Sequence, residues 1–221
     1  MFFEEGHLYH IYNQGNNRQR IFFTRENYLF FLSKIKKHVL PYSDILAWCL
    51  MPNHFHLMVH VNSLELPLGA GNYSANYPSN SSSSSSPSAT LSRARTTTVK
   101  TQSFQHSIGV MLASYTRAIN KQMNWSGSLF RSETKAICLT QVNKLTQAYY
   151  ISKGVTSINI QHPELQYPNI CFNYINLNPL KDGLVNRNED WEFSSYPDVV
   201  GLRNGKLISR ERILEFGLTI I

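Results

Sequence analysis

Alternating and helical patterns of apolar residues in the first part of the chain predict a strand, a helix and a hairpin. Residues 7–13 (HLYHIYN) alternate in part between polar and aromatic side chains, which is typical of a strand. After Thr24, apolar residues recur at three- and four-residue steps, so we expect a helix over about residues 25–39 with Thr24 as its N-cap. The apolar face predicted for this helix comprises Tyr28, Leu29, Leu32, Ile35 and Val39.

The densest apolar stretches, residues 45–50 and 54–61, flank a Met-Pro-Asn sequence at 51–53. Proline has no N–H for a sheet ladder, so Pro52 marks a turn and the two stretches are predicted to pair as an antiparallel hairpin. Side chains alternate across a strand, so one face of the second strand is expected to join the core and the other to display imidazoles. The core set is Phe55, Leu57, Val59 and Val61, and the other set is His54, His56, Met58 and His60.

The composition changes at about residue 63 to Ser, Asn, Thr, Gly and Pro, including six consecutive serines at 81–86. Such a segment buries too little apolar surface to offset the entropy lost on ordering, so residues 63–100 are predicted to form a flexible insertion. We therefore expect one domain made of residues 1–62 and 101–200, interrupted by this insertion and followed by a C-terminal tail at 201–221.

The second part of the chain adds an amphipathic helix over residues 103–123, a strand region over 128–139 and a helix over 141–153. The apolar side of the first helix comprises Phe104, Ile108, Met111, Leu112, Tyr115 and Ile119. A last helix over 169–178 is predicted to start after Pro168 and to stop at Pro179, with mostly irregular chain beyond Gly183. The order strand, helix, hairpin, helix, strand predicts an α+β fold: an antiparallel sheet with helices packed on one face.

Composition and charge narrow the functional classes. The 221 residues, 42% of them apolar, suffice for a globular core, and the formal charge of +7 favours an anionic partner such as nucleic acid. Cys49, Cys138 and Cys171 are an odd number without paired metal spacing, which fits a reducing cytosol better than a disulfide framework. The acidic start of the chain does not suit a signal peptide, and no apolar run approaches the roughly 18 residues of a membrane span. We expect a soluble cytoplasmic protein with no membrane partner, associated with the nucleoid.

His54 and His56 are the first candidates for chemistry. Two residues apart on a strand, their rings project from the same face within reach of one ion, while Phe55 between them anchors the strand in the core. The alternative is that both are ordinary polar residues on a half-exposed sheet face. The Met-Pro-Asn turn directly before His-Phe-His is a more specific signal than the two histidines alone.

Tyr174 and Asn178 are the second pair, because positions i and i+4 share one face of a helix. A phenol nucleophile would then lie beside an amide oxygen that completes a metal site. Mg²⁺ and Mn²⁺ accept carbonyl oxygen, and Mn²⁺ also accepts imidazole. The alternative is that Tyr174 packs in the core and that Asn178, before Pro179, ends the helix.

Two motifs in this sequence resemble a known family. MPNHFHLMVH at 51–60 is similar to the His-hydrophobic-His (HUH) signature of the IS200-like single-tyrosine transposases, and YINLNPLKDGLV at 174–185 is similar to the tyrosine motif of their REP-associated branch. GSLFR at 127–131, Lys135 and DWEFSSY at 190–196 also match. The resemblance extends over nearly the whole chain apart from the Ser-rich insertion.

The resemblance implies a DNA transposase: a single-strand endonuclease and strand transferase with a ferredoxin-like sheet, similar to RNA-recognition modules. It implies that Tyr174 is the nucleophile, forming a 5′-phosphotyrosine on hairpin-containing or repeat DNA. It also implies a catalytic divalent metal, Mg²⁺ or Mn²⁺, held by His54, His56 and Asn178. Arg131 and Lys135 are candidate DNA-phosphate contacts, with a solvated basic strand as the alternative.

Two other functions stay open from the sequence. One is a non-catalytic nucleic-acid-binding regulator that kept the same fold. The other is a hydrolytic metalloenzyme that uses His54, His56 and His60 and activates water. The sequence is also compatible with a monomer, in which Tyr174 completes its own site, or with a homodimer that exchanges tyrosine helices.

Overall fold

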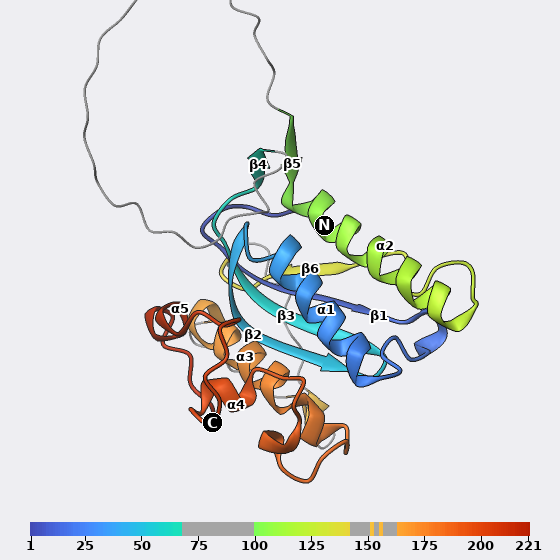
Figure 1. Cartoon of the computed structure of the whole chain (residues 1–221). Helices are drawn as coiled ribbons and strands as arrows, with labels where there is room; N and C mark the ends of the chain where they lie inside the picture. The colour runs from blue at the N-terminus through green and yellow to red at the C-terminus, as the bar shows by residue number, and fades with distance from the viewer. Residues whose placement is uncertain (68–99, 142–150, 153–154, 157–162) are drawn as a thin grey trace, which may run out of the picture.

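A four-stranded antiparallel sheet lies at the centre of the computed structural model, which describes residues 1–67, 100–141, 151–152, 155–156 and 163–221 (Figure 1). Its strands, in the spatial order β2-β3-β1-β6, are β1 (Leu8–Gln14), β2 (Ser43–Met51), β3 (His54–Val61) and β6 (Lys135–Cys138). The helix α1 (Arg25–His38) follows β1, and α2 (Phe104–Met123) lies between β3 and β6 in the chain. This arrangement is the ferredoxin-like fold that the family resemblance implies.

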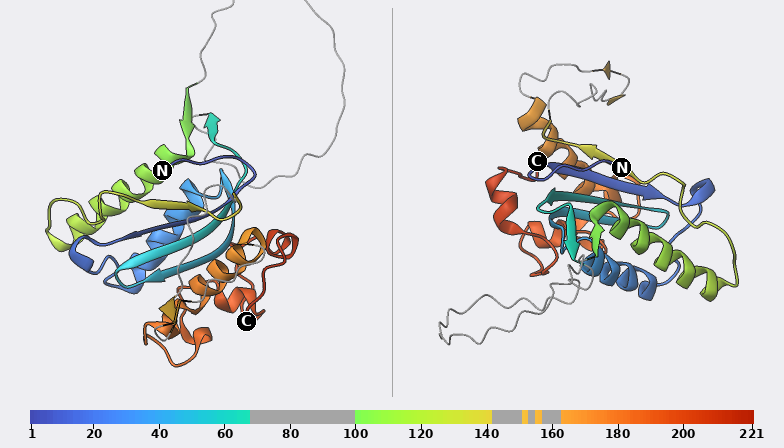
Figure 2. Two further views of the ribbon diagram at one scale, coloured as in Figure 1. Left: turned by 180° about the vertical axis from the view of Figure 1, so that it is seen from behind. Right: turned by 90° about the horizontal axis from the view of Figure 1, so that it is seen from above.

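Helices α1 and α2 pack side by side on one face of the sheet, as the two views of Figure 2 show. The N-terminus of α1 carries the predicted cap, because Thr24 and Asn27 form a capping box. One position of its predicted apolar face is wrong: Leu29 is 42% exposed, whereas Phe31 is completely buried. The buried stripe runs from Tyr28 through Phe31 to Ile35, at steps of three and four residues.

The ends and the inner face of α2 agree with the prediction. The Ser103 side chain accepts a hydrogen bond from the backbone N–H of His106, and Asn124 ends the helix in the left-handed conformation. All six apolar positions predicted to line one side are buried: Phe104, Ile108, Met111, Leu112, Tyr115 and Ile119. Tyr115 also donates a hydrogen bond of 2.7 Å from its hydroxyl to the backbone carbonyl of Ile21, which links α2 to the segment before α1.

The predicted hairpin is present, with Leu50 opposite Phe55 and Met51 opposite His54 on either side of the turn at Pro52. The β3 face expected to form the core packs under α1, where the rings of Phe31 and Phe55 lie 5.2 Å apart. The other face of β3 is covered as well, so the expectation of displayed imidazoles needs a correction. His56 and His60 are only 5% and 8% exposed, because the C-terminal part of the chain covers this face.

Helix α3 (Pro163–Lys181) provides much of that cover, since it lies across β2 and β3 on the face opposite α1 and α2 (Figures 1 and 2). The predicted limits of this helix are wrong, because both Pro168 and Pro179 lie inside it. Each proline removes one backbone hydrogen bond. The buried side chains of Phe172 and Ile175, both fully enclosed against the sheet, stabilise the helix enough to continue it past Pro179.

Buried hydrogen bonds link α3 to the edge strand β2 through Ser195, Asn176 and the backbone of Trp48. The Ser195 Oγ accepts a hydrogen bond of 2.9 Å from the backbone N–H of Trp48 and lies 2.7 Å from the Oδ1 of Asn176. Asn176 is on α3, and neither its side chain nor that of Ser195 is exposed. The 190–196 segment therefore joins the sheet edge to the helix that carries Tyr174.

The chain beyond Gly183, predicted to be mostly irregular, contains three short helices among its turns. They are η4 (Asn188–Asp190), α4 (Tyr196–Val199) and α5 (Arg210–Glu215). Inside this region the carboxylate of Asp198, only 1% exposed, accepts two hydrogen bonds from the guanidinium of Arg203, both 2.7 Å long. The residues predicted as a tail thus pack against the domain, where Leu207, Ile208, Ile213 and Leu218 are buried.

Strands β4 (Glu65–Pro67) and β5 (Thr101–Ser103) pair at the two ends of the predicted Ser-rich insertion. Residues 65–67, which the prediction placed inside the insertion, thus form a strand. Residues 68–99 lie outside the described part. The helix predicted over 141–153 also falls mainly outside it. The described residues Ile151 and Ser152 form strand β7, paired with β8 (Val155–Thr156).

All three cysteines are free and buried. Among the helices described, none is long and apolar enough to cross a membrane.

We expect Asn176→Ala to lower the free energy of unfolding by about 1–3 kcal/mol, because it removes a buried partner of Ser195. Urea unfolding measures this, with the exposed Asn186→Ala as a control expected to change it by less than about 0.5 kcal/mol. In a double-mutant cycle with Ser195→Ala, the two losses should not add. Additive losses would show that the contact between Asn176 and Ser195 contributes nothing.

Candidate active site

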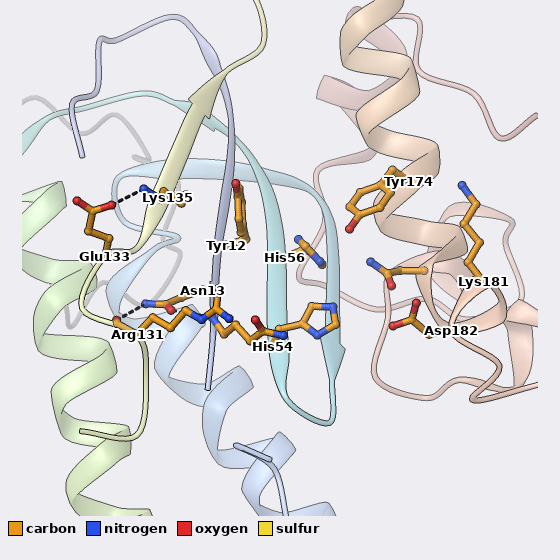
Figure 3. A pocket seen from close by; sticks show the side chains of 12 residues that line it. Tyr12, Asn13, His54, His56, Arg131, Glu133, Lys135, Tyr174, Lys181 and Asp182 are labelled. Atoms are coloured by element: carbon orange, nitrogen blue, oxygen red, sulfur yellow. Dashed lines mark hydrogen bonds and ion pairs between the residues drawn. The ribbon is translucent and has the colours of Figure 1, made fainter. Parts of the chain in front are cut away.

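A pocket of about 540 Å³ opens between the sheet and α3 (Figure 3). Its sheet side includes His54 and His56 of β3, whose ring centroids are 4.9 Å apart, together with Tyr12 of β1. Antiparallel pairing places Tyr12 directly opposite both His56 and Lys135, so these three side chains form one row across the sheet. Strand register therefore fixes the imidazoles, an aromatic ring and a cation on the same face.

Tyr174 reaches this pocket from α3. The centroid of its ring is 5.3 Å from that of His56, edge to face, and 41% of the side chain remains exposed. Asn178, one turn later on the same helix, lines the pocket too and is 3% exposed. A single chain thus brings together all four candidates that the sequence places far apart: Tyr174, Asn178, His54 and His56.

Hydrogen bonds fix the orientation of both imidazoles. The Nδ1–H of His54 donates to the Oδ1 of Asn53 at 2.6 Å, which leaves its Nε2 free of a proton in the neutral ring. The Nδ1 of His56 lies 2.9 Å from the Nε2 of His10, while the buried Nε2 of His56 has no hydrogen-bond partner among the described residues. In both rings a neighbour holds Nδ1 and Nε2 is left for another ligand, as in metal-binding histidines.

Burial keeps these rings neutral. It lowers the pKa of His56 well below its usual value, and the nearby His10 and His54 lower it further. The pKa of His10 falls to about 4 through burial alone. Burial also lowers the pKa of His54, although the carboxylate of Asp182 partly offsets this effect. At neutral pH the rings of His54 and His56 can therefore each offer one unprotonated nitrogen to a cation, whereas the Nε2 of His10 is in contact with His56.

The phenol of Tyr174 is not activated by its surroundings. Burial raises its pKa, the side chain of Asn178 lowers it in part, and the nearby Asp182 raises it again. The hydroxyl consequently stays protonated at neutral pH. A nucleophilic role would therefore need a cation close to the phenol oxygen. Lys181, also on α3, has its Nζ 5.9 Å from the centroid of the Tyr174 ring.

The donor atoms of the pocket determine which residues could hold a cation. Among the described residues, no group of three or more His, Cys, Asp or Glu side chains could hold a metal. The pocket offers two imidazole nitrogens and the amide of Asn178, whose buried Nδ2 is without a hydrogen-bond partner in the described part of the chain. Two imidazole nitrogens and the carbonyl oxygen of Asn178 are thus the groups that could bind a divalent ion here.

His60, the third ligand of the hydrolytic alternative, does not join this set. Its Nδ1 lies 2.9 Å from the Oδ1 of Asn62, and its ring packs 5.6 Å from that of Phe216. It does not line the pocket. The geometry therefore gives no support to a site of three histidines.

Arg131 and Lys135, the predicted DNA contacts, form the wall of the pocket opposite α3 (Figure 3). Lys135 forms an exposed ion pair with Glu133, whereas the Arg131 side chain has no ionic partner among the described residues. With Lys181 on the α3 side, cations border the pocket on two sides. This arrangement suits a polyanion that passes between them.

Sequence reasoning missed four residues around this site: His10, Tyr12, Lys181 and Asp182. His10 and Tyr12 were inside the predicted first strand, but only the register of β1 against β3 shows that they adjoin His56. Lys181 and Asp182 follow Pro179, where the helix was predicted to stop. Their spacing of seven and eight residues from Tyr174 would have placed them on its face of a longer helix.

Comparison with solved structures finds the same fold in a REP-associated tyrosine transposase bound to a REP hairpin. The superposition has a TM-score of 0.50 and covers 95% of each chain, at 14% sequence identity. The likeness implied by the two motifs is therefore present in the fold. No protein-family model and no curated protein sequence matches the chain.

We expect His10→Leu to lower the free energy of unfolding by about 1–3 kcal/mol, because the Nδ1 of His56 loses its buried partner. His10→Gln, whose amide reaches the position of the lost Nε2, should recover part of that loss. Urea unfolding measures both variants against His106→Leu, an exposed histidine on α2. Equal stability of His10→Leu and His106→Leu would contradict the role assigned to the contact.

Proposed function

We propose that this protein is a REP-associated transposase of the IS200-like kind, which cuts and rejoins single-stranded DNA with Tyr174 as nucleophile and a divalent metal as cofactor. The observation that carries the proposal is the position of Tyr174, 5.3 Å from His56 between ring centroids, on the helix that crosses the imidazole face. A fold shared with a REP-associated tyrosine transposase supports it.

A phosphodiester resists cleavage because its charge repels nucleophiles and its alkoxide is a poor leaving group. His54, His56 and Asn178 would hold a Mg²⁺ or Mn²⁺ ion, which polarises the phosphate and neutralises charge on the departing oxygen. The neighbours Asn53 and His10 keep the two Nε2 atoms available for it. Burial of the pocket strengthens these interactions, because the local dielectric constant is low.

In the proposed reaction the Tyr174 oxygen attacks phosphorus and releases its proton to solvent. The bond from phosphorus to the 3′ oxygen breaks, and this oxygen leaves as a 3′-hydroxyl after taking up a proton. The product is a 5′-phosphotyrosine. Attack by the 3′-hydroxyl of another strand reverses the chemistry and releases Tyr174, so rejoining needs no ATP.

The charged walls account for substrate binding. Arg131 and Lys135 on the sheet side and Lys181 on the helix side would contact phosphates next to the cleaved bond. DNA is the proposed partner, single-stranded or with a hairpin, because the structural neighbour is bound to a REP hairpin. A site completed within one chain supports cleavage in cis, by a monomer or by each subunit of a homodimer.

The first prediction concerns a covalent adduct. With a hairpin-containing single-stranded oligonucleotide and Mn²⁺, the protein should form a protein–DNA adduct that survives denaturation, and Tyr174→Phe should reduce it to background. Tyr12→Phe is the matched control, since it removes a second phenol from the same pocket and should leave the adduct intact.

The outcomes separate the competing functions. Cleavage that persists in Tyr174→Phe without an adduct would indicate a hydrolase. Binding of the hairpin without cleavage by the unmodified protein would indicate the non-catalytic regulator.

The second prediction concerns metal binding without DNA. Isothermal titration calorimetry should detect one Mn²⁺ per chain, and His54→Ala or His56→Ala should weaken it by about 100-fold or more, because loss of an outer partner alone typically costs 10–100-fold. His60→Ala should bind Mn²⁺ like the unmodified protein, since His60 faces Phe216 and not the pocket. Equal weakening in all three variants would contradict the proposed ligand set.

A further inference from the structure

A second, larger cavity adjoins the candidate active site. It has a volume of about 850 Å³ and lies between α2 and the segment 127–136 that leads into β6. We call it the α2 groove. Four residues line both cavities, namely Asn13, Arg131, Glu133 and Lys135. The α2 groove and the pocket that contains Tyr174 and the imidazole pair therefore meet at these residues, beside the edge strand β6.

The surface of the α2 groove combines small, apolar and polar groups. Gly109 and the exposed Ala113 leave open space on its helix side, and a Cβ atom built on Gly109 meets no atom within 4 Å. Phe130 lies at the base of the groove, but only 4% of it is exposed because its ring packs in the core. Thr116 and Asn120 line the same side, and Asn120 donates a hydrogen bond of 2.8 Å to the carbonyl of Gly127 that holds the opposite wall in place.

Two arginines give the α2 groove its charge. Arg117 projects from α2 and Arg131 stands where the groove meets the active-site pocket, and both are exposed. Neither guanidinium forms an ion pair with a carboxylate in the described part of the chain. The described carboxylate in the lining, Glu133, is already paired with Lys135. Two exposed cations along an open groove suit the phosphates of a nucleic-acid strand.

We propose that the α2 groove binds the unpaired DNA strand that continues from the phosphate at Tyr174, so that the substrate site extends beyond the catalytic pocket. This inference rests on the proposed function. An unpaired strand is the proposed ligand because the proposed reaction acts on single-stranded DNA, and its phosphates would face the exposed guanidinium groups of Arg117 and Arg131. The groove thus adds affinity for flanking sequence without contributing to the chemistry.

The test uses Tyr174→Phe as the background, so that binding is measured without adduct formation. Fluorescence anisotropy compares two series of single-stranded oligonucleotides that extend from the cleavage site one nucleotide at a time, one series in the 5′ direction and one in the 3′ direction. In one of the two series, affinity should rise once the strand is long enough to reach Arg117. The direction of that series gives the polarity of the bound strand.

Arg117→Ala should abolish this rise and leave the affinity for the shortest oligonucleotide unchanged. For the long strand it should also reduce the slope of log K against log salt by about 0.7, the value for one phosphate contact on single-stranded DNA. Lys36→Ala is the matched control, because it removes one exposed cation from α1, outside both cavities.

Three results would overturn the inference: no rise in either series, equal loss of affinity for short and long strands, or the same slope change in Lys36→Ala. The trapping experiment on Tyr174 is independent of this comparison. Adduct formation with no effect of Arg117→Ala would reject the α2 groove alone. A rise that depends on Arg117 in a protein without adduct would reject the catalytic function and keep the binding site.

Discussion

The packing of α3 across the sheet is the interaction on which the site depends. Strand β3 alone would carry its histidines on an open surface, where water would compete for every ring nitrogen. The apolar side chains of Phe172 and Ile175 hold the helix down, and Asn176 fixes it to the sheet edge through Ser195. The same packing buries His56, which lowers the pKa of its imidazole, and places the ring of Tyr174 beside that imidazole. Stability and candidate chemistry therefore have one structural origin.

Local signals were sufficient for most of the fold. Caps at Thr24 and Ser103, the turn at Pro52 and the helical spacing along α2 each act over a few residues, so the sequence shows them directly. Their order predicts an antiparallel sheet with helices, and the family resemblance implied its ferredoxin-like arrangement. The position of Phe31 was the exception within α1, because five successive apolar or aromatic residues at 28–32 leave the buried stripe undefined by pattern alone.

The features of the fold and of the site that the sequence did not predict depend on contacts between segments far apart in the chain. The continuation of α3 through Pro179 follows from burial against β2 and β3, which overrides the local preference to stop. That His10 supports His56 follows from strand register, since His10 is paired with Met58 and reaches His56 along the diagonal. The Tyr174 and Asn178 positions were identified by motif resemblance and helical spacing, and their approach to the imidazoles became visible only in three dimensions.

The short pairing of β4 with β5 has a consequence for how this chain can vary. Pro67 lies opposite Thr101, so the two ends of the Ser-rich stretch are neighbours in space whatever its length. The entropy of closing a loop grows only with the logarithm of its length, so adding or removing residues there changes folding by a small amount. A fused reporter or an affinity tag could therefore be inserted at this position, because the paired strands keep the two ends of the insertion together.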